Sequence, residues 1–276
     1  MTSGAPGDRA RERAGVPASP VRARRPWRDL AGRAATAVGI VAGWEALVRL
    51  LGITSAVLPA PSAIAAEMLE LHTAILSAAA YTMSSAVQGY AAALVVGVLL
   101  AIVFAHSGTL QRGLFPFFVA SQAVPVIAFS AVVILWLGNG PLSKIAIAFY
   151  LSFFPITVSA VKGLQSADPM SVALLRTFGG GSWQVLWKIR IPTMLPFLFV
   201  ALRVATTTAL IGAIVGEWFG DNNGIGTLIL QALHSEDTVR LWSGIVACAA
   251  MGTVFYAAVG VVERRLLWWP APALES

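Results

Sequence analysis

The sequence predicts an all-α polytopic membrane protein with about six transmembrane helices. Hydrophobic residues make up 57% of the chain and charged residues only 12%, whereas about a quarter of the residues in a typical soluble protein are charged. Apolar segments of about 20 residues, which is enough to cross a ~30 Å hydrocarbon layer, recur along the chain. We expect them at residues 34–51, 85–106, 113–137, 143–162, 192–215 and 241–262.

The remaining segments differ in composition from these spans. Residues 1–33 contain eight of the nineteen basic residues and few large apolar ones, which predicts a disordered basic cytoplasmic tail. Residues 34–266 would form the membrane domain, and residues 267–276 a short cytoplasmic tail. Residues 61–81 begin with prolines and contain two glutamates, which favours a short amphipathic helix along the membrane surface.

The distribution of Lys and Arg predicts the orientation, because cytoplasmic loops carry the excess of these residues. With the amino terminus inside, fifteen of the nineteen basic residues lie on the cytoplasmic side. Six spans return the carboxyl terminus to the same side. The net charge of +6 therefore fits the positive-inside rule better than nucleic-acid binding, and residues 165–191 become the longest internal cytoplasmic loop.

The loop at residues 165–191 has the signals of a helix that starts and stops sharply. Asp168 can cap free backbone amides, and Pro169 fits the first helical position. A helix of about ten residues would then reach Phe178. Gly179 begins a run of three glycines, which can end that helix in a left-handed conformation.

A second short helix is predicted directly after these glycines. Ser182 can cap it, and Pro192 marks the entry into the next span. The sequence thus favours two short helices across the membrane surface, with an ordinary amphipathic loop as the alternative. The side chains expected on one face are Val185, Leu186 and Ile189, and those suited to the headgroup boundary are Trp183 and Trp187.

In this loop the chain resembles the type I permeases of binding-protein-dependent ABC importers, especially the nitrate, taurine and sulfonate subgroup. Their signature is E-A-A, three residues, Gly, nine residues, then I-x-L-P. Gly179 occupies the glycine, and the run from Ile189 to Pro192 follows at the required spacing, while Ala173, Leu174 and Leu175 stand in place of E-A-A. The resemblance covers roughly residues 40–265.

The resemblance implies a type I permease fold whose first short loop helix is a coupling helix, inserted in a groove of a separate ATP-binding subunit. It also implies an external solute-binding protein and a dimer of permease chains in the cytoplasmic membrane. The chain has no G-x-x-x-x-G-K-[ST] loop to hold phosphates, so ATP hydrolysis is expected on the partner and no enzyme activity here. The coupling residues expected are Asp168, Ala173, Leu174, Arg176, Phe178, Gly179, Ile189 and Pro192.

Five polar residues in or near spans are candidates for the solute pathway or its gate. Arg203 has no local partner and precedes Thr207, so it could line the pathway, or snorkel and bond to neighbouring helices. Glu217 begins a Gly-rich outer segment, where it could belong to a gate or be solvated. Ser121 and Gln122 could contact solute or join helices. Nearby Pro125, like Pro155 in the fourth span, could kink its helix.

No metal site or cofactor is predicted, because the three histidines are scattered. The resemblance allows nitrate, sulfonate or taurine as solute, and also pyrimidine thiamine precursors or riboflavin. One alternative is a secondary transporter or channel that needs no ATPase, which would favour internal repeats or an acidic relay. An intramembrane enzyme would need a nucleophile with a base or a metal cluster, and the sequence assembles neither.

Overall fold

The computed structural model describes residues 26–219 and 221–267, and these residues form helices joined by loops, with no strand among them. The chain divides into two compact units, of which the first ends at Leu47 and the second begins at Val48. The predicted tails at the two ends of the chain fall largely outside the described ranges.

Helix α1 spans Pro26–Leu50 and therefore begins before the predicted span at residues 34–51. Its last 18 residues contain Arg33, Glu45 and Arg49, and it is not among the described helices that are apolar enough to cross a membrane. The first of the six spans therefore stays a prediction.

Four described helical segments are long and apolar enough to cross a membrane, and a fifth is reached if one bent pair is counted as a single span. An all-α polytopic membrane fold is thus confirmed. The four segments are α3 (His72–His106), α6 (Pro141–Gln165), α8 to α9 (Ser182–Glu217) and α11 (Thr238–Leu266), and the bent pair is α4 (Gly108–Ser121) with α5 (Val126–Leu137).

The third predicted span, residues 113–137, is two helices rather than one. α4 and α5 meet at 98°, and Pro125 occupies the extended N-cap position of α5. Proline lacks an amide hydrogen and disfavours helical geometry at the residue before it, so the helix ends ahead of Pro125. Pro155, in contrast, lies inside the continuous helix α6.

The surface helix predicted at residues 61–81 is also two elements. α2 spans Pro61–Glu70, and α3 starts at His72, so about half of the expected amphipathic segment belongs to a long spanning helix. The glutamates that suggested a surface position are not all solvated, because Glu67 accepts a hydrogen bond of 3.3 Å from Arg240 Nε on α11. Glu67 thus pairs with a residue of another helix rather than pointing into water, as a surface helix would have required.

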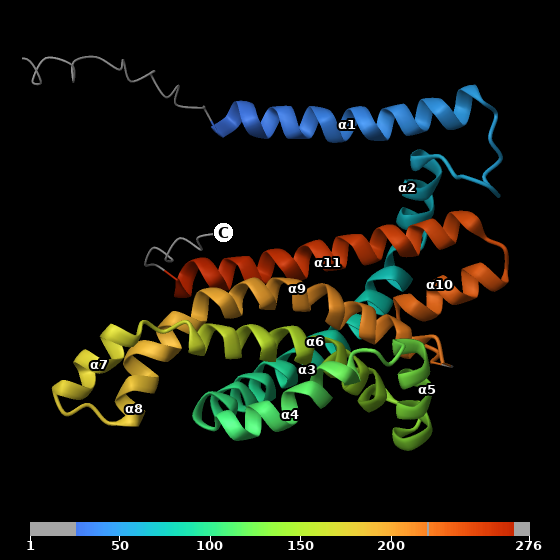
Figure 1. Ribbon diagram of the computed structural model, residues 1–276. Coiled ribbons are helices and arrows are strands. Elements are labelled where there is room, and N and C mark those ends of the chain that lie inside the picture. The colour runs from blue at the N-terminus through green and yellow to red at the C-terminus, as the bar shows by residue number, and fades with distance from the viewer. Residues whose placement is uncertain (1–25, 220, 268–276) are drawn as a thin grey trace, which may run out of the picture. The chain divides into compact units, whose positions relative to one another are not determined.

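The second unit is built around α6, which packs against both α3 and α9 (Figure 1). Small residues allow these helices to approach closely. A Cβ added to Gly89 of α3 would lie 2.6 Å from Ala148 Cβ on α6, and one added to Gly212 of α9 would lie 2.7 Å from Ala148 Cα. The three backbones therefore meet at one alanine.

This core separates two ends of the second unit. α6 has 25 residues, which corresponds to a length of ~37 Å at 1.5 Å per residue. The short helices α7 (Pro169–Thr177) and α8 (Ser182–Val185) lie at one end, and α5 and α10 (Ile225–His234) lie at the other (Figure 1). Most of the site residues predicted from the sequence lie at these two ends or on α9.

We expect Gly212→Ala to lower the stability of the chain by about 1–3 kcal/mol, because the new methyl group would overpack the crossing of α9 with α6. Gly252→Ala in α11 is the matched control, since its Cβ would find Leu210 Cδ2 at an ordinary 3.7 Å. The thermal unfolding midpoint of the purified full-length chain measures both. Equal midpoints for the two variants would contradict the close crossing.

Candidate functional site

The helix α7 begins where the sequence predicts. Asp168 occupies its N-cap, where Oδ1 accepts a hydrogen bond from Met170 N at 3.1 Å and Oδ2 accepts one from Ser171 N at 2.9 Å. The Ser171 hydroxyl donates a further bond of 2.6 Å to the same carboxylate. Hydrogen bonds from Ser171 and Met170 hold the pKa of Asp168 below its ordinary value, so this cap is charged at neutral pH.

The end of α7 also follows the prediction. Gly179 has a φ of 79°, which a residue with a side chain adopts only with strain. Its amide donates to Arg176 O, and the amide of Gly180 donates to Leu175 O, both at 2.9 Å. These two bonds satisfy carbonyl groups that the last turn of α7 would otherwise leave without partners.

The second loop helix differs from the prediction. The N-cap of α8 is Gly181 rather than Ser182, and the Gln184 side chain accepts a hydrogen bond of 3.2 Å from the Gly181 amide. α8 then passes through a π-helical turn, η1 (Leu186–Arg190), into α9 (Ile191–Glu217) without a break. Pro192 therefore lies inside a continuous helical segment, whereas the sequence predicts that it marks the entry into a separate span.

One face of α7 is exposed and apolar. Met170, Leu174 and Phe178 are spaced four apart, so they lie on the same side of the helix, and 76%, 58% and 81% of their surfaces are exposed. Trp183 and Trp187 are also exposed and pack edge to face with ring centroids 5.6 Å apart. This end of the second unit thus presents large apolar side chains that the chain itself does not cover.

A cavity of about 620 Å³ lies between α7, the end of α6 and the last residue of η1. Two predicted coupling residues, Ala173 and Arg176, line it together with Arg190. Ile189, another predicted coupling residue, is half-buried, while Val185 and Leu186 are fully buried. The predicted set therefore divides into an exposed group on α7 and a buried group where α8 joins α9.

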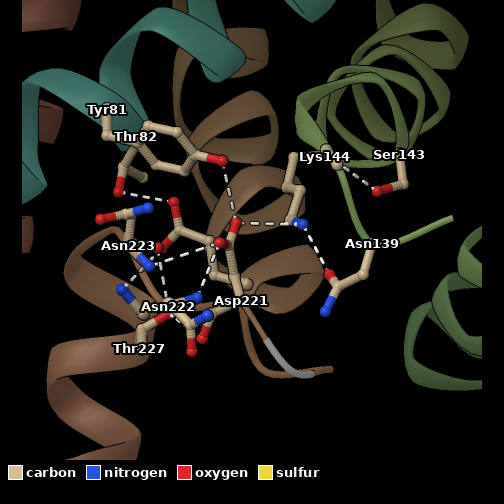
Figure 2. A network of polar contacts seen from close by, with 12 residues as sticks. Tyr81, Thr82, Asn139, Ser143, Lys144, Asp221, Asn222, Asn223 and Thr227 are labelled. Atoms are coloured by element: carbon tan, nitrogen blue, oxygen red, sulfur yellow. Dashed lines mark hydrogen bonds and ion pairs between the residues drawn. The ribbon is translucent and has the colours of Figure 1, made fainter.

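A polar network lies at the opposite end of the core (Figure 2). Lys144, the fourth residue of α6, is fully buried, and its ammonium group lies 3.0 Å from the Asp221 carboxylate and 2.8 Å from Asn139 Oδ1. Tyr81 of α3 donates a hydrogen bond of 3.0 Å to the same carboxylate. Burial opposes ionisation of Asp221, but the hydrogen bonds from Lys144 and Tyr81 outweigh it and lower the pKa.

Glu217 is buried beside this network, with 1% of its surface exposed, which excludes the alternative of a solvated loop residue. Its carboxylate accepts hydrogen bonds of 2.7 Å from the Thr82 hydroxyl and from Gly226 N in the first turn of α10. Gly224 has a φ of 107°, and a Cβ there would clash with the Glu217 carboxylate. Glu217 thus joins α3, α9 and α10.

Arg203 has a partner that sequence reasoning missed. Glu263 on α11 lies 2.5 Å from Arg203 Nη2 and accepts a hydrogen bond of 2.6 Å from Nε, and Tyr256 Oη lies 3.1 Å from Nη1. These groups and the exposed Thr207 line a cavity of about 710 Å³ on the surface formed by α9 and α11. Arg203 and Thr207, both predicted pathway residues, therefore do share one surface.

Ser121 and Gln122 lie elsewhere, at the break between α4 and α5. The Ser121 backbone carbonyl accepts a hydrogen bond from the Tyr150 hydroxyl, its own hydroxyl donates to Phe118 O at 2.7 Å, and Gln122 caps α4. Within the described ranges, no hydrogen bond or ion pair connects them to Arg203 or Glu217. The five predicted pathway or gate residues thus lie in three separate locations rather than in one site.

The network residues Tyr81, Thr82, Lys144 and Asp221 were not predicted from the sequence. A lysine at the start of an apolar helix was a usable signal, because a charge inside a membrane protein needs a partner. Within the residues that the structure describes, no cluster of three His, Cys, Asp or Glu side chains could hold a metal ion.

Comparison with known proteins relates the chain to a family of transport proteins. Residues 93–268 match the family described as "Binding-protein-dependent transport system inner membrane component". The chain is 32% identical to a formylaminopyrimidine transport permease protein of Halalkalibacterium halodurans, over 82% of the chain and 90% of that protein. It is 31% identical to a riboflavin transport system permease protein of Chloroflexus aurantiacus, over 83% and 86%. It is 27% identical to a putative aliphatic sulfonates transport permease protein of Bacillus subtilis, over 83% and 84%.

We expect Lys144→Met to lower the stability of the chain by about 3 kcal/mol, because it leaves Asp221 as a largely buried carboxylate without its cation. Adding Asp221→Asn should recover most of the loss. Lys162→Met, at an exposed lysine of the same helix, is the control and should have little effect. Thermal unfolding midpoints test this, and a double variant no more stable than Lys144→Met would refute the pairing.

We expect Glu217→Ala to destabilise the start of α10 by about 2 kcal/mol, since it removes the acceptor of two buried hydrogen bonds. Hydrogen exchange at the Gly226 amide should accelerate in this variant. Glu70→Ala, which removes an exposed glutamate at the end of α2, should leave that rate unchanged. Unaltered exchange at Gly226 in Glu217→Ala would show that the carboxylate does not hold α10.

Proposed function

We propose a working mechanism for this chain from the family to which it belongs, the binding-protein-dependent transport system inner membrane components. The chain is the permease subunit of an ATP-binding-cassette importer. The observation that carries the mechanism is α7, a capped helix with an exposed apolar face that stands at one end of the packed core.

In this proposal, α7 is the coupling helix and binds a separate ATP-binding subunit. Its exposed side chains Met170, Leu174 and Phe178 form the contact surface, because large apolar groups at the end of a membrane domain gain most by packing against a partner. The Asp168 cap and the Gly179 stop fix the length and direction of the helix. A rigid helix can transmit a push from the partner, whereas a flexible loop would absorb it.

The coupling end lies in the cytoplasm, and so do both chain termini. The basic residues of the α7 region and of the last turn of α11, together with those of the amino-terminal tail, belong to this side by the positive-inside rule. The network of Lys144, Asp221 and Glu217 then lies at the extracytoplasmic end. There an external solute-binding protein delivers its cargo, and the contacts of Glu217 hold α10 as part of the gate.

The exposed face of α9 and α11 is covered by a second copy of the chain, and the solute pathway runs along it. Arg203 and Glu263 are only partly covered, with 32% and 22% of their side chains exposed, and such a pair is costly against lipid. A second copy packed on the flanking Val200, Val204 and Ile211 would remove this face from lipid. The dimer would leave the polar groups facing a water-filled path.

The solute is a small organic molecule or oxyanion, and a neutral or zwitterionic nitrogen heterocycle fits best. Among the described residues that line the 710 Å³ cavity on α9 and α11, Arg203 is the one cation, and Glu263 neutralises its charge. A path for an anion such as a sulfonate would be expected to offer an unpaired positive charge. Two relatives named above transport formylaminopyrimidine and riboflavin, which are heterocycles.

ATP binding in the partner acts on this chain by favouring one of two membrane conformations. A ligand shifts such an equilibrium only through contacts that differ between the two states. In the proposal those contacts are made at α7, and they reach the extracytoplasmic end through α9, which runs unbroken from the coupling loop to Glu217.

The test uses two glycine positions in one loop. Gly179→Ala forces a side chain into a φ of 79°, whereas Gly181→Ala acts at a φ of −78°, and neither Cβ meets another atom within 4 Å. In proteoliposomes with the ATP-binding and solute-binding partners, we expect Gly179→Ala to reduce solute-stimulated ATP hydrolysis and uptake about tenfold, because strain misdirects α7. Gly181→Ala should behave like the wild type.

Deletion of residues 170–178 should abolish association with the ATP-binding subunit while leaving membrane insertion intact. Normal association in the deletion variant would show that α7 is not the coupling helix. ATP-independent uptake by the unaltered chain alone would instead indicate a secondary transporter or channel.

A further inference from the structure

The guanidinium group of Arg190 is partly buried in the coupling region and is incompletely hydrogen-bonded. Its Nε is buried and has no hydrogen-bond partner among the described residues. Nη1 makes a single weak bond of 3.3 Å to Ala105 O on α3. A guanidinium offers five donors in a planar fork, and leaving buried donors without acceptors is costly. The geometry therefore calls for an acceptor supplied from outside the described chain.

The surroundings of Arg190 favour a carboxylate as that acceptor. Arg176 lines the same 620 Å³ cavity, none of the described lining residues is acidic, and the remaining walls are largely apolar. Two arginines without an acid give the cavity a positive charge. The apolar walls lower the dielectric constant beside Arg190 relative to bulk water, which strengthens its interaction with an anion. An Arg fork and a carboxylate match in shape and can form two parallel hydrogen bonds.

Ala173 explains why the chain does not supply the carboxylate itself. This alanine stands where the permease signature has the glutamate of E-A-A, and it lines the same cavity as Arg190. A glutamate at this position would place an acid in the cavity from within the chain. The alanine instead leaves room for an acidic side chain to enter from α7's partner.

We propose that the cavity formed by Arg190, Arg176 and Ala173 receives an acidic side chain of the ATP-binding subunit, so that a salt bridge between the subunits anchors the coupling helix. This inference rests on the proposed function of α7. The occupant is a protein side chain rather than a lipid headgroup, because the cavity opens beside α7, whose exposed apolar face already requires a protein partner.

The experiment measures binding of the purified ATP-binding subunit to the full-length permease in phosphatidylcholine nanodiscs, with and without phosphatidylglycerol. Arg190→Met keeps the apolar stem and removes the fork, and we expect it to weaken binding about tenfold in both lipids. Lys188→Met, which removes an exposed charge two residues away that does not line the cavity, is the matched control. Its binding should remain within about twofold of the wild type.

A second variant keeps the inference testable if Arg190→Met perturbs the fold. Ala173→Glu offers the cavity an internal carboxylate, so it should weaken binding of the partner in the wild-type background. It should have no further effect when combined with Arg190→Met, because the arginine that both acids need is then absent. Thermal unfolding midpoints of all variants separate lost binding from lost folding.

Three results would overturn the inference. Equal binding of the ATP-binding subunit to Arg190→Met and Lys188→Met would leave the cavity without a role in docking. A loss confined to nanodiscs with phosphatidylglycerol would assign the cavity to an anionic lipid headgroup. If the wild-type chain binds no ATP-binding subunit at all, the proposed coupling function fails together with this salt bridge, whereas wild-type binding that Arg190→Met leaves intact refutes only the salt bridge.

Discussion

The close packing of α6 against α3 and α9 is the constraint on which the rest of the structure depends. Ala148 lies where Gly89 and Gly212 bring all three backbones together, and a larger side chain at either glycine would separate the helices. Because the three helices are held in register there, Lys144 at the start of α6 meets Asp221 after α9. For the same reason Arg190 before α9 reaches Ala105 near the end of α3. The geometry at both ends of the second unit therefore depends on this one helix crossing.

The features that could be predicted from the sequence are those that neighbouring residues decide. The Asp168 cap and the left-handed Gly179 involve bonds across two to five residues, so their signals lie within the loop. The apolar spans are equally local, because length and composition alone make them visible. The continuous helix from α8 through η1 into α9 was not predicted. Residues 186–190 contain no glycine or proline that would end a helix, but the sequence offers no signal that distinguishes a π-helical turn from an α-helical one.

The polar partnerships could not be predicted, because they join residues far apart in sequence. Arg203 pairs with Glu263 on α11, and Glu217 accepts from Thr82 on α3. These groups come within reach only when the helices pack, and the residues of a single sequence do not indicate which helices touch. The broken third span is an intermediate case. Pro125 indicated a kink, but whether a proline bends a helix or ends it depends on the residues packed around it, as Pro155 within α6 illustrates.

The continuity of the helical segment from Ser182 to Glu217 links the two ends of the permease physically. Arg190 lies in the π-helical turn at its coupling end, and Glu217, which holds α10, is its last residue. A π-turn is wider than an α-turn and is frequently found at functional sites. If a partner's carboxylate fixes Arg190, the winding of this turn sets the rotation and height of α9. The position of Glu217 follows, because Glu217 is the last residue of the same unbroken helix. A contact made at the coupling cavity thus has a direct route along one helix to Glu217, the residue that the proposed function assigns to the gate.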